Sequence, residues 1–179
     1  ARKLFLDGRW GLGAAPPALG EPLGTALLRP TRIYVKPILA VLRTYRIKKV
    51  IHAMAHITGG GLPGNVPRVL PPNVDAILYT NRWEAPPIFR LIAETGGVPE
   101  REMYRVFNMG IGMVVVVAPH FSASILSPFV SLRVPARRDA HVEEAVAAEV
   151  PELFPLPREE TLTASSVSSR WRSSIPFTR

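Results

Sequence analysis

The sequence predicts an α+β fold in which helices cover a small sheet. Short apolar runs at 74–79 (VDAILY) and 113–118 (MVVVVA) have the β-branched character of strands. The segment 87–97 begins with proline and ends in two glycines, which is typical of a short helix. Helical and extended segments alternate irregularly along the chain, and this favours α+β over the other classes.

The other elements follow from local pattern. Residues 11–24 are so rich in Gly and Pro that we expect a linker or a loop that wraps a neighbour. Beyond them the expected elements are a short helix at 23–28, an extended segment at 32–36, an amphipathic helix from Pro37, a short helix at 47–54, one or two helical turns at 62–70, and helices at 87–95 and 99–105.

Composition limits the protein class. The chain has 179 residues, of which 47% are hydrophobic and 20% charged, as in globular proteins. It has no cysteine, which excludes a disulfide framework and any Cys-ligated zinc or iron–sulfur site. The longest apolar run is far below the ~20 residues of a membrane span, and Asp7 and Arg9 interrupt the apolar N-terminus. We therefore expect a cytoplasmic protein with no membrane partner.

The formal net charge of +8 is unevenly distributed. Residues 1–120 hold 15 of the 22 Lys and Arg and only 7 of the 14 acids. The stretch 29–49 contains seven basic residues and no acidic one. An anionic ligand nearby and a solvated helix face explain this stretch equally well. A nucleic-acid partner would rest on net charge alone, and we expect none.

Composition changes abruptly near residue 120. All thirteen glycines precede residue 113 and all ten serines follow residue 121. No lysine occurs after residue 49. We predict a domain at 1–118, with 1–24 as its linker or wrapping segment, followed at 119–179 by an unlike tail that is disordered or translated from another reading frame. One helix is expected in the tail at 141–150 (HVEEAVAAEV).

Three consecutive glycines lie in the stretch 56–65, HITGGGLPGN. If an extended segment ends at Thr58 and a helix begins at Leu62, the backbone N–H groups between them converge on one point, which suits an anion such as phosphate. The stretch fits neither a Walker A loop nor a dinucleotide fingerprint. A flexible surface loop is the alternative interpretation.

Candidate catalytic and metal-binding groups are few. His52 and His56 have a spacing that could place two ligands on one helix face, but no carboxylate or third His lies near, and we expect no metal site. Asn108 precedes two spaced glycines, and it either forms a turn or directs its amide into a cleft. The carboxylates are scattered, so the sequence indicates no catalytic residue.

Four separated blocks carry a family resemblance: PTRIYVKP (30–37), MAHITGGGLPGNVPRVLP (54–71), PPIFRLIAETGGV (86–98) and EMYRVFNMGIGM (102–113). Together they resemble the C-terminal half of the phosphoribosylformylglycinamidine cyclo-ligase family, also called aminoimidazole ribonucleotide synthetase. The resemblance covers residues 1–118. It implies the α+β domain of that superfamily, incomplete at its C-terminal end.

The resemblance also implies a function. The family uses ATP to close the imidazole ring of formylglycinamidine ribonucleotide in purine biosynthesis. This chain would supply only the C-terminal domain, inactive alone, while an N-terminal domain absent here holds most of the ATP and Mg²⁺ site and the homodimer contact. A non-catalytic phosphate-binding or nucleotide-binding module left by truncation is the alternative.

The site residues come from the same resemblance. Thr58, Gly59, Gly60 and Gly61 would form a phosphate cradle for the small-molecule ribonucleotide substrate. His56, Asn65 and Asn108 would be polar contacts. Lys36 and Arg68 would be weaker anion contacts.

Overall fold

The computed structural model describes residues 2–5, 10–132, 136, 140–144 and 159–163, and it confirms the α+β class. In chain order the elements are α1 (Arg2–Phe5), α2 (Leu23–Leu27), α3 (Val35–Thr44), β1 (Ile51–His56), α4 (Gly61–Asn65), the 3-10 turn η1 (Val66–Val69), β2 (Val74–Tyr79), η2 (Thr80–Arg82), α5 (Pro87–Gly96), α6 (Glu100–Val106), β3 (Met113–Val117), η3 (Pro119–Phe121), α7 (Ser122–Ser131), β4 (Ala140–Glu144) and β5 (Glu159–Thr163).

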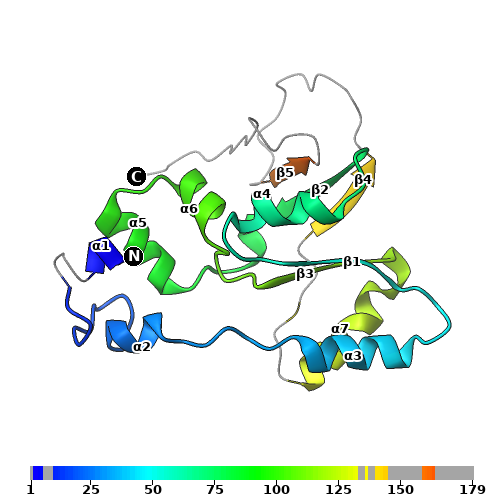
Figure 1. Cartoon of the computed structure of the whole chain (residues 1–179), viewed down its shortest axis with the longest axis horizontal. Helices are drawn as coiled ribbons and strands as arrows, with labels where there is room; N and C mark the ends of the chain where they lie inside the picture. Colours follow the sequence, from blue (N-terminus) through cyan, green and yellow to red (C-terminus); the bar gives the residue numbers. More distant parts are fainter. Residues whose placement is uncertain (1, 6–9, 133–135, 137–139, 145–158, 164–179) are drawn as a thin grey trace.

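The described strands form two separate antiparallel sheets. β1 pairs with β3 alone, whereas β2 lies between β4 and β5 in a three-stranded sheet. In Figure 1 the β1–β3 pair crosses the middle of the molecule, with α3 and α7 on one side and with α4 and the three-stranded sheet on the other. The strand pair is therefore the central layer of the fold.

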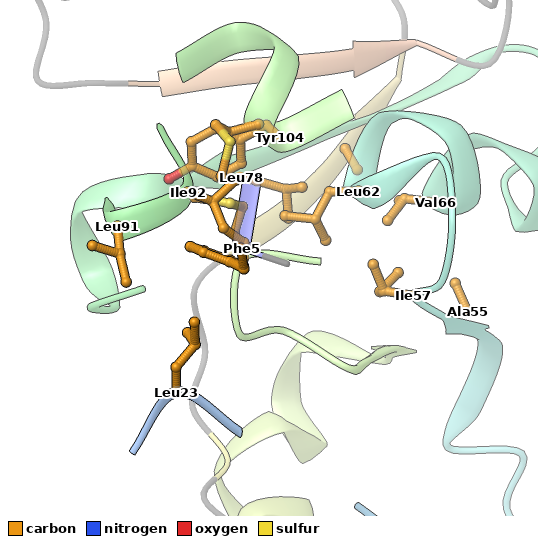
Figure 2. Close-up of a cluster of buried hydrophobic side chains, with 13 residues drawn as sticks. Phe5, Leu23, Ala55, Ile57, Leu62, Val66, Leu78, Leu91, Ile92 and Tyr104 are labelled. Atoms are coloured by element: carbon orange, nitrogen blue, oxygen red, sulfur yellow. The ribbon is translucent and has the colours of Figure 1, made fainter. Parts of the chain in front are cut away.

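A first hydrophobic cluster lies between α4, α5, α6 and the end of β1 (Figure 2). Its fully buried side chains include Phe5, Leu23, Leu62 and Met103, which come from four different helices. Each large apolar side chain buried in this way stabilises the fold by about 1.5–3 kcal/mol. The cluster thus fixes α4, and with it the glycine loop, against α6.

A second cluster lies on the other side of the strand pair, between α3 and α7. Ile38 and Val41 of α3 pack with Ile125 and Phe129 of α7, and the partly buried β3 residues Val115 and Val117 pack against them. Because β1 and β3 contribute to both clusters, strand pairing and helix packing hold the central layer together.

Several elements match their sequence signals. The strand predicted at 74–79 is β2, and the helix predicted from Pro87 is α5, which ends at Gly97 in the left-handed conformation with φ +58°. The helix expected at 99–105 is α6, and the turns expected at 62–70 are α4 and η1. β3 begins at Met113 as predicted, but all five of its residues are only half-buried.

The helix expected at 47–54 is wrong. Bends occupy 46–48, and β1 begins at Ile51. The residues of β1 alternate between the interior and solvent, and β1 pairs with the valine-rich β3 along its length, with one register shift between Ile51 and Ala53. Long-range strand pairing therefore overrides the weak helical signal of this segment.

Two further expectations need correction. The segment 32–36 is not wholly extended, because α3 already begins at Val35, and Pro37 lies within its first turn, where proline is tolerated. In the tail, residues 141–144 of the expected helix belong to strand β4, which pairs along β2. The rest of that expected helix, 145–150, lies outside the described residues.

Candidate functional site: two glycine loops at one end of a strand pair

The register of the central strand pair brings two glycine loops together. His56, the last residue of β1, lies opposite Met113, the first residue of β3. The loop that leaves β1 and the loop that enters β3 are therefore neighbours. The N–H of Ile57 joins them by donating to the carbonyl of Gly112 at 3.0 Å. We call 58–61 the first loop and 108–112 the second loop.

The first loop depends on left-handed backbone. Gly60 has φ +96° and Gly61 has φ +58°, a backbone region that residues other than glycine rarely adopt. The N–H of Gly61 donates to the carbonyl of Thr58 at 3.1 Å, and the N–H of Gly64 donates to that of Gly60 at 2.9 Å. The chain thus turns directly from β1 into α4.

Gly61 also needs to be glycine because of what it touches. A Cβ at this position would lie 1.8 Å from the carbonyl oxygen of Tyr104 and 2.8 Å from that of Phe107. Both oxygens belong to backbone at the end of α6, which packs in the first cluster. The first loop is therefore pressed against α6 with no room for a side chain. Since Phe107 directly precedes Asn108, the same contact places the second loop beside it.

Asn65 is the one buried polar residue among the described residues, with 6% of its surface exposed. Its side-chain amide donates to the carbonyl of Gly61 at 2.7 Å, of Gly59 at 3.2 Å and of Thr58 at 3.4 Å. The amide faces the interior of the first loop. The structure thus places Asn65 beneath the loop, where it contacts loop backbone.

The outer side of the first loop carries donors. Thr58 and Gly59 are exposed, and Gly60 is half-buried. The N–H groups of Gly59 and Gly60 donate to no described residue. The expected extended segment followed by a helix is present, but α4 has only five residues, so its dipole adds little. Anion binding here would rest on the loop N–H groups.

The second loop closes on itself. The side-chain oxygen of Asn108 accepts the N–H of Gly110 at 3.1 Å, and its backbone carbonyl accepts the N–H of Ile111 at 2.9 Å. Asn108 therefore forms the turn that was one of its two interpretations. Met109 is buried with φ +49°, the one described non-glycine residue in this region of backbone space.

Three aromatic or proline side chains hold the second loop. The indole N–H of Trp83 donates to the carbonyl of Met109 at 3.1 Å. A Cβ on Gly110 would lie 2.6 Å from Pro86, and one on Gly112 would lie 2.0 Å from the hydroxyl of Tyr34. Sequence reasoning missed these contacts, although Tyr34 and Pro86 lie within the family-like blocks. These contacts join segments far apart in the sequence, and no local sequence signal indicates them.

His56 is exposed at the edge of this site. Its ring meets the ring of Tyr34 edge-on, with the centroids 6.3 Å apart. His52 and His56 lie on the same face of a strand, so their Cα atoms are about 13 Å apart, too far to share a metal ion. In the part of the chain that the structure describes, no group of three His, Cys, Asp or Glu could hold a metal ion.

The basic candidates are less closely tied to the loops. Lys36 is exposed in the first turn of α3, two residues beyond Tyr34, and Arg68 is exposed in η1, directly after α4. Within the basic stretch 29–49, Arg29 forms an ion pair with Glu21, and Lys48 lies over the ring of Phe121 at 5.5 Å. Part of the positive charge therefore has partners within the chain.

The sequence of this chain matches a known protein domain. Residues 1–146 match the family described as AIR synthase related protein, C-terminal domain. The chain belongs to this family. The match continues past residue 118, where the composition changes, and includes α7, which packs on α3.

Curated relatives agree with this assignment. The chain is 50% identical over 128 residues to a phosphoribosylformylglycinamidine cyclo-ligase of Myxococcus xanthus, covering 71% of this chain and 36% of that protein. It is 51% identical over 117 residues to one of Alkaliphilus metalliredigens, covering 65% and 33%. It is 56% identical over 115 residues to one of Anaeromyxobacter sp. Fw109-5, covering 64% and 30%. The chain spans about a third of the length of these relatives, and the predicted resemblance is confirmed.

The longest described helices, α3, α5 and α7, have ten residues each. Within the described ranges, no helix combines the length and apolar character needed to cross a membrane.

Proposed function

We propose that this chain supplies the C-terminal domain of an ATP-dependent cyclo-ligase that closes the imidazole ring of formylglycinamidine ribonucleotide in purine biosynthesis. Three relatives at 50–56% identity are phosphoribosylformylglycinamidine cyclo-ligases, which supports this activity. The observation that carries it in the structure is the pair of adjoining glycine loops, in which the N–H groups of Gly59 and Gly60 donate to no described residue. The proposal extends to a cytoplasmic protein that works on a small-molecule ribonucleotide.

We propose the first loop as the phosphate cradle. The N–H groups of Gly59 and Gly60 are donors without a protein acceptor in the described chain, and glycine lets a phosphate approach the backbone closely. The Thr58 hydroxyl is on the exposed side and adds a donor. Hydrogen bonds to an ionised phosphate are roughly twice as strong as neutral ones.

The surrounding residues would position the rest of the ligand. His56 extends the site along β1, and Asn108 keeps its amide N–H donors outside the turn that its oxygen closes. Lys36 and Arg68 would attract an anion over a longer range. Ring closure of this kind depends on orienting and stabilising phosphates rather than on a protein nucleophile, so these residues would bind and orient.

ATP and Mg²⁺ belong to the proposal only through the family. Magnesium prefers carboxylate and water oxygens, and the described residues form no group of acidic side chains that fits it. We therefore assign no step to the metal and propose that ATP and Mg²⁺ are held mainly outside this chain. Exposed apolar side chains along α3, Val35, Leu39 and Leu42, support a covering partner such as an N-terminal domain or a homodimer subunit.

Ring closure by a mixture of two proteins tests the activity. The full chain is assayed alone and with the N-terminal two-thirds of the Myxococcus xanthus relative, using ATP and formylglycinamidine ribonucleotide. We expect no product from either part and measurable product from the mixture. Phosphate binding by the chain without product in the mixture would favour the alternative, a non-catalytic phosphate-binding module.

The boundary at 118 stays a prediction. Translation of the coding DNA after the Ala118 codon in the other two frames tests it, because a family-like segment in one of them would identify the tail 119–179 as a product of a frame change. No such segment, together with a protease-resistant tail, would contradict it.

A further inference from the structure

We infer that Asn65 is a positioning residue that turns the donors of the first loop outward, and that it does not contact the ligand itself. The inference rests on the proposed phosphate cradle and assigns a role to a side chain beneath it. Asn65 is 6% exposed, so little of it can reach a bound molecule. Its donors are already used within the loop.

The geometry explains how one side chain can set three peptide groups. One N–H of the amide points to the carbonyl of Gly61 at 2.7 Å, and the other is shared between Gly59 at 3.2 Å and Thr58 at 3.4 Å. A carbonyl held inward turns the N–H on the other side of the same peptide outward. The carbonyls of Thr58 and Gly59 precede the N–H groups of Gly59 and Gly60. Both of these N–H groups donate to no acceptor among the described residues.

Peptides between glycines need such hydrogen bonds to hold one orientation. Peptides between glycines rotate easily, because no Cβ restricts φ and ψ. Without the amide, the three carbonyls would lose this donor, and the carbonyl of Thr58 would keep only the N–H of Gly61. Rotation of the freed peptides toward solvent would then satisfy the carbonyls. The N–H groups would then no longer converge. Asn65 therefore contributes to binding by removing the cost of ordering the loop when the ligand arrives.

Isothermal titration of the full 179-residue chain with inorganic phosphate tests the inference. The variants are Asn65→Ala, which removes the donors, and Asn65→Ser, whose hydroxyl can still donate to the carbonyl four residues earlier, that of Gly61. We expect the phosphate affinity to fall at least about tenfold in Asn65→Ala. We expect a loss in Asn65→Ser as well, because a hydroxyl that reaches the carbonyl of Gly61 leaves the carbonyls of Thr58 and Gly59 without this donor.

Val66→Ala is the matched control. Val66 is fully buried in the first cluster next to Asn65, so its truncation destabilises the same region without removing a hydrogen bond to the loop. We expect Val66→Ala to lower the melting temperature and keep the phosphate affinity. A purely structural role of Asn65 would give the same pattern in Asn65→Ala.

The outcomes separate the two claims. No phosphate binding by the unchanged chain would refute the cradle. Binding by the unchanged chain with equal affinity in folded Asn65→Ala would refute the positioning role alone. If Asn65→Ala does not fold, equal affinity of folded Asn65→Ser and the unchanged chain refutes it, and a loss with Val66→Ala unaffected supports it.

Discussion

The two glycine loops lie side by side at one end of the β1–β3 pair, but they are built in opposite ways. The first loop, 58–61, is held from beneath by Asn65, and its Gly59 and Gly60 N–H groups donate to no described residue. The second loop, 108–112, uses its own N–H groups for a turn and is held by side chains from distant segments. Gly59 leaves open space for the proposed ligand, whereas Gly61, Gly110 and Gly112 are glycines because neighbouring atoms leave no room for a Cβ.

Within the first loop, the glycines differ in how much room they leave for a Cβ. Gly61→Ala should have the largest effect, because its Cβ would overlap the backbone oxygen of Tyr104 at 1.8 Å. We expect a loss of at least about 4 kcal/mol in the free energy of unfolding, measured by urea denaturation. Gly59→Ala is the stability control. Nothing lies within 4 Å of a Cβ there, and we expect a change below about 0.5 kcal/mol. Equal losses at the two positions would contradict the packing described.

Gly60→Val should separate binding from folding. A Cβ at Gly60 meets only ordinary contacts, the nearest atom being the Cα of Gly64 at 3.5 Å, but φ +96° strains a β-branched residue by about 1–3 kcal/mol. The branched side chain would also block the approach of a phosphate. We expect a folded protein without phosphate binding in calorimetry. Unchanged phosphate affinity in the folded variant would refute phosphate binding by the first loop.

In the second loop, Gly112→Ala should lower the free energy of unfolding less than Gly61→Ala does. The atom it meets is the hydroxyl of Tyr34, at the end of a side chain that can move, and a clash of this kind costs about 1–3 kcal/mol. Tyr34→Phe removes that hydroxyl. The two changes together should therefore cost less than the sum of the single changes, measured as a double-mutant cycle of unfolding free energies. Strict additivity would show that the two residues do not touch.

Trp83→Phe should have the smallest effect of the series. It removes the hydrogen bond to the carbonyl of Met109, worth about 1 kcal/mol, and keeps an aromatic ring in a half-buried place. We expect a small decrease in melting temperature and unchanged phosphate affinity. A loss of phosphate binding as large as that of Gly60→Val would mean that the second loop also holds the phosphate.

The sequence predicted the local elements with strong end signals. Pro87 and Gly97 bound α5, and the β-branched run at Val74–Tyr79 is β2. The prediction failed at β1. The apolar Met54 lies on the exposed face of this strand together with His52, so the sequence shows little polar–apolar alternation, and pairing with β3 decides the structure. Which strands pair is a long-range property, and local propensity does not contain it.

The sequence predicted which residues form the glycine loop of the site, but not the contacts that hold the two loops. The glycine run indicated close backbone approach, and the structure places it between β1 and α4 as expected. The family resemblance implies that Asn65 contacts the ligand, whereas in the structure its buried amide donates to the loop carbonyls. The contacts of Tyr34 and Trp83 with the second loop join segments far apart in sequence, and no local pattern reveals them.

The central claim is that the first loop binds phosphate and the second does not. A titration of the ¹⁵N-labelled full chain with inorganic phosphate, followed through backbone amide resonances, tests it most directly, because glycine amides are well resolved. The account predicts saturable shifts at Gly59 and Gly60 and little change at Gly110 and Gly112. Shifts confined to the second loop, or no saturable shift at Gly59 and Gly60, would contradict it.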